Sequence, residues 1–137
     1  MVLDVGCGDF LIRGAEGVDS HTAKIGPTYY LVQADELVYH DQSELDFIVC
    51  NYFDAFPNVL KTLNEWNRVL KPKGLLAIIV RDSSQYPELA GPLENKHRVN
   101  VFTKDTIKHY LYRAKFEEVT VDYGDEKSLR VKGRKSA

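Results

Sequence analysis

Cysteine is scarce in this chain: among its 137 residues there are two, Cys7 and Cys50. Two cysteines are too few for the disulfide framework of a small secreted domain, and they lack the CxxC or Cys/His spacing of a zinc site. This scarcity predicts a protein of the reducing cytoplasm that binds no metal.

Long hydrophobic runs are absent as well. The longest, Leu75 to Val80, is far shorter than the roughly 20 apolar residues of a membrane-spanning helix. Met1 leads directly into Val2-Leu3-Asp4, without the basic stretch and apolar core of a secretory signal. With 44% hydrophobic and 28% charged residues, residues 1–137 are expected to form one soluble domain with no membrane contact.

The net charge of −2 hides an imbalance along the chain. Residues 1–60 carry ten Asp and Glu against Arg13 and Lys24, whereas residues 61–137 carry ten acids and sixteen bases. We therefore expect two differently charged surfaces. The bases are dispersed and lack the interleaved aromatic side chains that stack on nucleobases, so nucleic-acid binding is not expected.

Five apolar stretches have the composition of buried strands. They are Val2–Val5, Ala15–Asp19, Tyr29–Ala34, Asp46–Cys50 and Leu75–Val80. The last is apolar throughout, which is typical of a central parallel strand covered on both faces.

Two helices are expected after the fourth strand. Between Pro57 and Pro72, apolar residues recur at three- and four-residue steps and form one stripe. Thr103 is a plausible N-cap for the second helix. Apolar and polar residues then alternate over 119–123 and 129–131, the pattern of an antiparallel hairpin. The sequence thus predicts an α/β fold with a mostly parallel sheet that ends in an antiparallel hairpin.

The first three strands are followed by glycines or acids, namely Gly6-Cys7-Gly8, Asp19-Ser20 and Asp35-Glu36. Ligands of open α/β sheets bind at the carboxyl ends of the strands, where glycine permits close approach and an acid can accept both ribose hydroxyls. A nucleoside-containing cofactor is therefore expected. A pyrophosphate is not, because Asp9 would repel it, and Leu11 replaces the third glycine of a nicotinamide fingerprint.

Several successive stretches resemble the motifs of one family. They are Val2-Leu3-Asp4-Val5-Gly6-Cys7-Gly8, Gly17-Val18-Asp19, Gln33-Ala34-Asp35, Leu45-Asp46-Phe47-Ile48-Val49, Glu65-Trp66-Asn67-Arg68-Val69-Leu70-Lys71-Pro72-Lys73-Gly74 and Ala114-Lys115-Phe116-Glu117-Glu118-Val119. Their order and spacing are similar to those of the class I S-adenosylmethionine-dependent methyltransferases, short form. The resemblance covers almost the whole chain and implies a Rossmann-like fold with S-adenosylmethionine as the cofactor.

The resemblance also implies roles for residues in the first turn. Asp4 would organise this turn and help to hold the amino group of the cofactor, while the backbone of Gly6, Cys7 and Gly8 would lie against its methionyl part.

Further roles follow from the resemblance at the next two strand ends. Asp19 would bind the ribose hydroxyls, with Ser20 beside it. Asp35 would meet the adenine amino group, and Glu36 and Leu37 would shape the pocket of the ring.

At the fourth strand end, the resemblance implies that Cys50 and Asn51 line the side from which the methyl group leaves. The chain departs from the family at Phe10, which replaces a glycine, and at Phe53-Asp54-Ala55, which replaces a common Leu-Glu-His. A third departure is Pro72-Lys73-Gly74 in place of Pro-Gly-Gly. The first two favour an alternative function, a degenerate methyltransferase fold that acts as a non-catalytic binding or assembly module.

No residue stands out as a catalytic base. Tyr52, Asp54, Asp82 and His97 lie in or near expected loops at the active edge, and a base is needed only where the acceptor has a proton to lose. The catalytic residue is therefore left unassigned. The long loop from Arg81 to Asn100 is expected to select the acceptor, a small molecule or a saccharide-type compound.

The N-terminal helices of this fold are expected to be missing or minimal. Nine residues between Gly8 and Val18, and ten between Asp19 and Tyr30, leave room for a turn or two of helix. Right-handed crossovers place the two strong helices on one face of the sheet. We expect the other face to pair with a second copy, as a homodimer, or with a partner protein.

Overall fold

The computed structural model describes residues 1–6, 11–19, 29–31, 33–51, 53, 56–84 and 102–137. Its strands are β1 (Val2–Val5), β2 (Glu16–Asp19), β3 (Tyr29–Leu31), β4 (Leu45–Asn51), β5 (Leu70–Arg81), β6 (Phe116–Tyr123) and β7 (Ser128–Lys135). The helices are α1 (Val59–Val69), α2 (Lys104–Arg113) and a short 3-10 turn, η3 (Asp125–Lys127).

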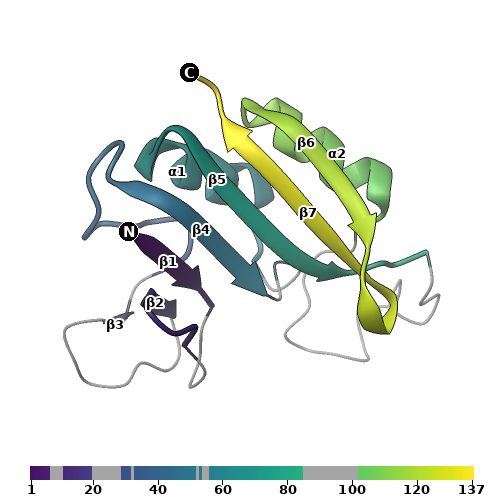
Figure 1. Ribbon diagram of the computed structural model, residues 1–137, viewed down its shortest axis with the longest axis horizontal. Helices are drawn as coiled ribbons and strands as arrows, with labels where there is room; N and C mark the ends of the chain where they lie inside the picture. Colours follow the sequence, from purple (N-terminus) through teal and green to yellow (C-terminus); the bar gives the residue numbers. More distant parts are fainter. Residues whose placement is uncertain (7–10, 20–28, 32, 52, 54–55, 85–101) are drawn as a thin grey trace.

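The seven strands form one sheet in the order β3-β2-β1-β4-β5-β7-β6 (Figure 1). The first five are parallel, and β7 lies antiparallel between β5 and β6. The expected α/β class, the Rossmann-like parallel sheet and the C-terminal antiparallel hairpin are confirmed. The strand order also separates the charges, because the acidic residues 1–60 supply β3-β2-β1-β4 and the basic remainder supplies β5-β7-β6.

Both helices begin at residues that cap them. Asn58 caps α1, since its side chain accepts a hydrogen bond from the Lys61 N–H at 3.1 Å. Thr103 caps α2 as predicted, in a reciprocal capping box with Thr106. Pro57 lies just before Asn58, the N-cap of α1. β5 starts at Leu70, five residues earlier than expected, because Leu70 pairs with Leu45 of β4 before a register shift.

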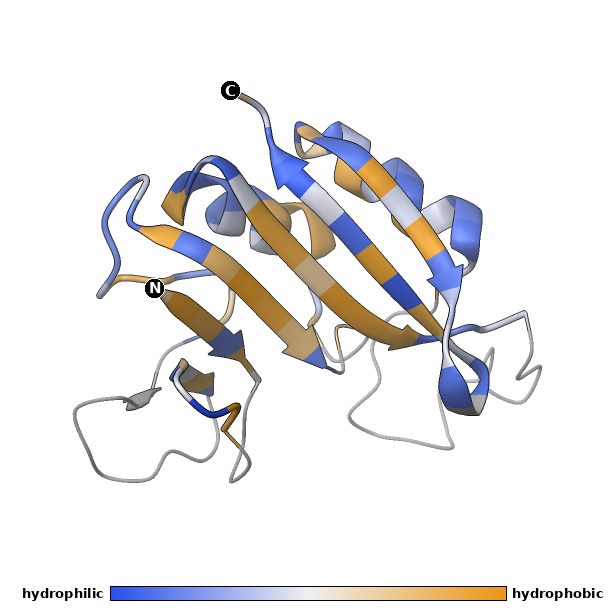
Figure 2. Cartoon of the chain, viewed as in Figure 1, coloured by the Kyte–Doolittle hydropathy of each residue, from blue (hydrophilic) through white to orange (hydrophobic). Residues whose placement is uncertain are grey.

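The helices α1 and α2 cover the same face of the sheet (Figure 1). Val59, Leu63, Trp66 and Val69 of α1 are buried against it. At Gly133 of β7 a Cβ atom would lie 3.2 Å from Leu111 Cδ2 of α2, so this strand position faces α2 at close range. Figure 2 shows β5 hydrophobic along most of its length, whereas β7 alternates.

The opposite face of the sheet carries no helix from the described residues, as expected. Side chains alternate along a strand. Lys132 and Arg134, which flank Gly133 in β7, therefore point to this face. Lys132 pairs in register with Ala77, and Arg130 with Ile79. Ile79 is 41% exposed, so the central strand retains an uncovered apolar side chain. Within the described residues, neither helix has the length and apolarity to cross a membrane.

Candidate functional site

The carboxyl ends of β3, β2, β1 and β4 lie side by side at one edge of the sheet, because these strands are parallel neighbours. The backbone N–H of Gly6, just after β1, donates to the Val18 carbonyl oxygen of β2 at 2.7 Å. Gly6 adopts a φ of +72°, a left-handed conformation that favours glycine. A Cβ atom there would lie 3.5 Å from Phe56 Cζ and 3.7 Å from the Asn51 carbonyl oxygen. Its backbone conformation, rather than lack of space, therefore requires glycine at this turn.

Asp4 connects the two ends of the segment that follows β1. Its carboxylate is 4% exposed and accepts a hydrogen bond from the Ile12 N–H at 3.1 Å. Burial raises the pKa of Asp4, and the Ile12 hydrogen bond partly opposes this shift. The side chain thus anchors the return of the chain toward β2.

The predicted residues Cys7, Gly8 and Ser20 lie outside the described residues. So do Phe10 and several loop residues considered for catalysis, namely Tyr52, Asp54 and His97.

Asp19 ends β2, whereas Asp35 lies in a turn four residues beyond Leu31, where β3 ends earlier than the expected Ala34. Asp19 is the last residue of β2 and pairs with Leu31 of β3. Asp35 follows β3, is about one-fifth exposed, and its Oδ2 lies 3.4 Å from Nζ of Lys61 on α1. The same ammonium group lies 3.0 Å from Oε1 of Glu36. These two carboxylates raise the pKa of Lys61, with the Glu36 hydrogen bond as the largest cause.

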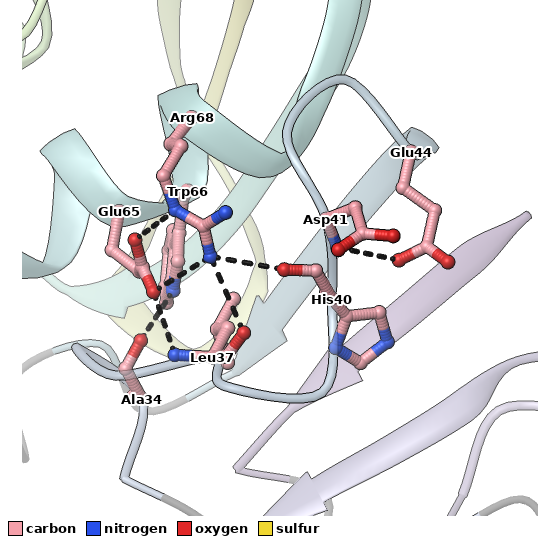
Figure 3. Close-up of polar contacts among 8 residues, drawn as sticks. All are labelled: Ala34, Leu37, His40, Asp41, Glu44, Glu65, Trp66 and Arg68. Atoms are coloured by element: carbon pink, nitrogen blue, oxygen red, sulfur yellow. Dashed lines mark hydrogen bonds and ion pairs between the residues drawn. The ribbon is translucent and has the colours of Figure 1, made fainter.

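Residues 34–40, which carry both of these acids, are fastened to α1 by a polar network (Figure 3). Trp66 Nε1 donates to the Ala34 carbonyl oxygen at 2.9 Å, and Glu65 Oε2 accepts from the Leu37 N–H at 2.7 Å. Arg68 Nη2 donates to the carbonyl oxygens of Leu37 and His40 at 3.3 and 3.1 Å. The residues on either side of Asp35 and Glu36 are therefore held by α1.

Glu65 and Arg68 also bind each other. The Arg68 Nε to Glu65 Oε1 distance is 2.6 Å, and the guanidinium group lowers the pKa of the Glu65 carboxyl. Together with Asp35, Lys61 and Asn64 they line a hollow of about 490 Å³. Sequence reasoning missed this charged face of α1, although Lys61, Glu65 and Arg68 recur at the four- and three-residue steps that share one side of a helix.

At the end of β4, Cys50 and Asn51 lie in different surroundings. Cys50 is fully buried, and its Sγ–H donates to the Asn51 carbonyl oxygen at 3.2 Å. Asn51 is exposed at the end of the strand. The ring of Phe53 is fully buried, with its centroid 5.4 Å from Trp66 and 5.5 Å from Phe102. The structure buries the Cys50 thiol in the core. Its predicted contact with a cofactor stays a prediction.

Asp82, a candidate base, lies just beyond β5 and is 1% exposed. Its Oδ1 accepts hydrogen bonds from the N–H and hydroxyl groups of Ser84 at 3.0 and 2.7 Å. This carboxylate stabilises a local turn. Among the described residues there is no group of His, Cys, Asp and Glu side chains arranged to hold a metal ion.

The acceptor groups at this edge fit an adenosine group. Two carboxylates, Asp19 and Asp35, follow adjacent strands, and carboxylates accept hydrogen bonds from hydroxyl and amino groups. The positive φ of Gly6 brings bare backbone to the same edge. Within the described part of the chain, the carboxyl ends of β1, β2 and β3 carry no lysine or arginine to neutralise a pyrophosphate; Lys61, on α1, is paired with acids.

Comparison with known structures shows the same fold in proteins of distant sequence. A S-adenosylmethionine-dependent methyltransferase from Thermotoga maritima is similar with a TM-score of 0.80 and 16% identity, over 98% of this chain and 82% of that one. One from Archaeoglobus fulgidus gives 0.79 and 14%, over 98% and 85%. A complex between the Haloferax volcanii Trm112 methyltransferase activator and a methyltransferase gives 0.78 and 15%, over 99% and 82%.

Among curated proteins, the comparison finds no match. The family described as "Methyltransferase domain" matches residues 3–78, which is more than half of the chain and includes β1 to β4, α1 and most of β5. The chain therefore belongs to the methyltransferase-domain family, and its fold is that of the class I S-adenosylmethionine-dependent methyltransferases.

Proposed function

We propose that residues 1–137 form one methyltransferase domain that binds S-adenosylmethionine and transfers its methyl group to a small-molecule or saccharide-type acceptor. The observation that carries the proposal is the convergence of the Gly6 turn, Asp19 and Asp35 on one sheet edge in a member of this family. The chain's two cysteines are too few for a disulfide framework, and we propose that it acts in the reducing cytoplasm.

Each candidate site residue that the structure describes has a part in the proposed cofactor site. Asp19 accepts hydrogen bonds from the ribose hydroxyls, and Asp35 accepts one from the adenine amino group. Glu36 borders the ring. Asp4 holds the first turn through Ile12, and the Gly6 backbone lies against the methionyl part. Cys7, Gly8 and Ser20 belong to the same proposal from the sequence, as do Cys50 and Asn51 on the side of methyl departure.

The bound sulfonium supplies an electrophilic methyl group to a nucleophile placed in line with it. Holding the two partners at attack distance provides much of the acceleration of such a displacement. The chain's residues therefore act mainly by binding and orientation, and a base is required only for an acceptor that must lose a proton. Asp82 is engaged with Ser84, so we assign no catalytic base.

Isothermal titration calorimetry with S-adenosylmethionine and S-adenosylhomocysteine tests cofactor binding. Transfer of a labelled methyl group to members of a panel of metabolites and saccharides then tests the reaction. Absence of heat with both ligands would exclude the proposed function.

A non-catalytic binding module is the alternative that Phe53 favours. Its buried ring belongs to a cluster with Phe56, Trp66 and Phe102, at a position where the resembling family commonly has a Leu-Glu-His segment. Binding of S-adenosylmethionine without transfer to any acceptor would support this alternative over the enzyme.

We further propose that a second copy covers the helix-free face, which is the side of the sheet opposite α1 and α2 on which the described residues place no helix. A two-fold axis parallel to the strands, between β4 and β5, lays the basic half of one copy over the acidic half of the other. It also buries Ile79 near the centre. Arg130, Lys132 and Arg134 lie on this face and supply the basic part of the contact. If a different protein covers this face instead, the purified chain is a monomer. Measuring the oligomeric state therefore distinguishes a second copy from a different partner.

A further inference from the structure

We propose that Lys61 is a positioning residue that orients the Asp35 carboxylate. Through this orientation, the site selects a nucleobase that carries an exocyclic amino group. The inference rests on the proposed function, since it concerns the adenine end of the same cofactor site. It adds a residue outside the motifs that led to the family.

The backbone around Asp35 and Glu36 is fixed from both sides by α1. Ala34 is bound through its carbonyl oxygen to Trp66 Nε1, and Leu37 through its N–H to Glu65. With both flanking residues held, the freedom that remains at this turn is chiefly the rotation of the two acidic side chains.

Lys61 restricts the rotation of these two side chains. Its ammonium group lies 3.4 Å from Asp35 Oδ2 and 3.0 Å from Glu36 Oε1, and so joins two adjacent carboxylates that would otherwise repel each other. Asp35 Oδ1 has no hydrogen-bond donor among the described residues. One oxygen of Asp35 is thus held by the protein, and the other is available to accept a hydrogen bond.

Lys61 is itself well placed to serve as a fixed point. It lies in the first turn of α1, where its N–H is bound by the Asn58 cap at 3.1 Å. Glu65, one turn further along, holds the Leu37 N–H. The helix therefore presents the ammonium group toward the same segment, residues 34–40, whose backbone it binds.

Orientation of an acceptor before binding lowers the entropic cost of the hydrogen bond that it makes. Without Lys61, the Asp35 carboxylate can rotate, and the bond to the amino group of adenine is weakened. Because Lys61 is about half exposed, the loss should be modest, about threefold in affinity.

The test compares S-adenosylhomocysteine with S-inosylhomocysteine, in which oxygen replaces the amino group of the base. Calorimetry should show that Lys61→Met weakens binding of the first about threefold and leaves binding of the second unchanged within error. Lys61→Arg should restore the preference for the amino group. Lys108→Met, the same substitution at a partly buried lysine of α2, should leave both affinities unchanged.

A double-mutant cycle with Asp35→Asn provides a second readout that needs S-adenosylhomocysteine alone. If Lys61 acts through Asp35, adding Lys61→Met to Asp35→Asn causes no further loss. Equal weakening of both ligands, or an additive loss in the cycle, would overturn the inference while leaving the proposed function intact. Absence of binding to the wild-type chain would instead reject the proposed function, and the inference with it.

Discussion

The indole N–H of Trp66 donates a buried hydrogen bond to the carbonyl oxygen of Ala34, 32 residues earlier in the chain, at 2.9 Å. This contact joins the middle of α1 to the start of the segment that carries Asp35 and Glu36. Since Trp66 is also fully buried against Phe53 and Phe56, one side chain contributes both to the core and to the position of the candidate site.

Trp66→Phe should destabilise the chain by about 2 kcal/mol, because it leaves the Ala34 carbonyl oxygen without its donor and removes part of a packed ring. Urea unfolding at pH 7 measures the change. Tyr123→Phe, at a position that is 61% exposed, is the matched control and should change the stability by less than about 0.5 kcal/mol. An equally small effect of Trp66→Phe would show that the hydrogen bond contributes little.

Gly6→Ala and Gly14→Ala form a matched pair. Both glycines have a positive φ, +72° and +85°, and neither would place a Cβ atom in a clash, so each substitution should cost about 1 kcal/mol of stability from backbone strain. Gly6→Ala alone should weaken binding of S-adenosylhomocysteine, because Gly6 lies in the turn proposed to contact the methionyl part. Thermal unfolding and calorimetry measure the two effects. Equal affinities for the two variants would argue against a ligand at this turn.

Glu65 should contribute stability at neutral pH that disappears in acid. Arg68 lowers the pKa of its carboxyl below the ordinary value of 4.5, so the folded state favours the charged form. Its contribution is present above the unfolded pKa and is lost as the pH falls through the folded one. Glu65→Gln should therefore destabilise the chain by about 1.5 kcal/mol at pH 7, and the difference from wild type should shrink below pH 4.5. Urea unfolding at several pH values measures it, and a difference independent of pH would contradict this prediction.

Ile79→Glu should dissociate the proposed dimer. The substitution places a charge near the centre of the helix-free face, whereas Tyr112→Glu, at a similarly exposed position on α2, should leave the dimer intact. Light scattering at micromolar concentration gives the mass of each variant. Because the two halves of the sheet carry opposite charge, high salt should also weaken the dimer. A wild-type chain that is monodisperse and monomeric would contradict the proposal.

The sequence predicted the parts of the fold that depend on local patterns. The apolar runs at Val2–Val5 and Leu75–Val80 lie in the interior strands β1 and β5, and Thr103 caps α2. These features could be predicted because periodicity and capping act over a few residues. The early start of β5 at Leu70 was missed, since it depends on pairing with Leu45, 25 positions earlier in the chain. Pairing between distant segments leaves little trace in the sequence nearby.

The residues proposed for the candidate site also come from local patterns, and their contact with a cofactor stays a prediction. Asp4, Asp19 and Asp35 stand out as acids near strand ends. The role proposed for Lys61 could not be anticipated, because a lysine on a helix surface is ordinary until the fold brings Asp35 and Glu36 to it. Cys50 is fully buried. The position of this residue at the end of a strand could not show whether its side chain is buried or exposed.

The central claim, that the edge formed by β1 to β4 binds S-adenosylmethionine, is tested most directly by calorimetry on the wild type, Asp19→Ala and Asp122→Ala. Asp122 is an exposed aspartate on the distant edge strand β6 and serves as the matched control. We predict that wild type and Asp122→Ala bind S-adenosylhomocysteine equally, and that Asp19→Ala binds at least about tenfold more weakly through loss of the bonds to the ribose hydroxyls. Equal binding by all three proteins, or binding by none, would contradict the claim.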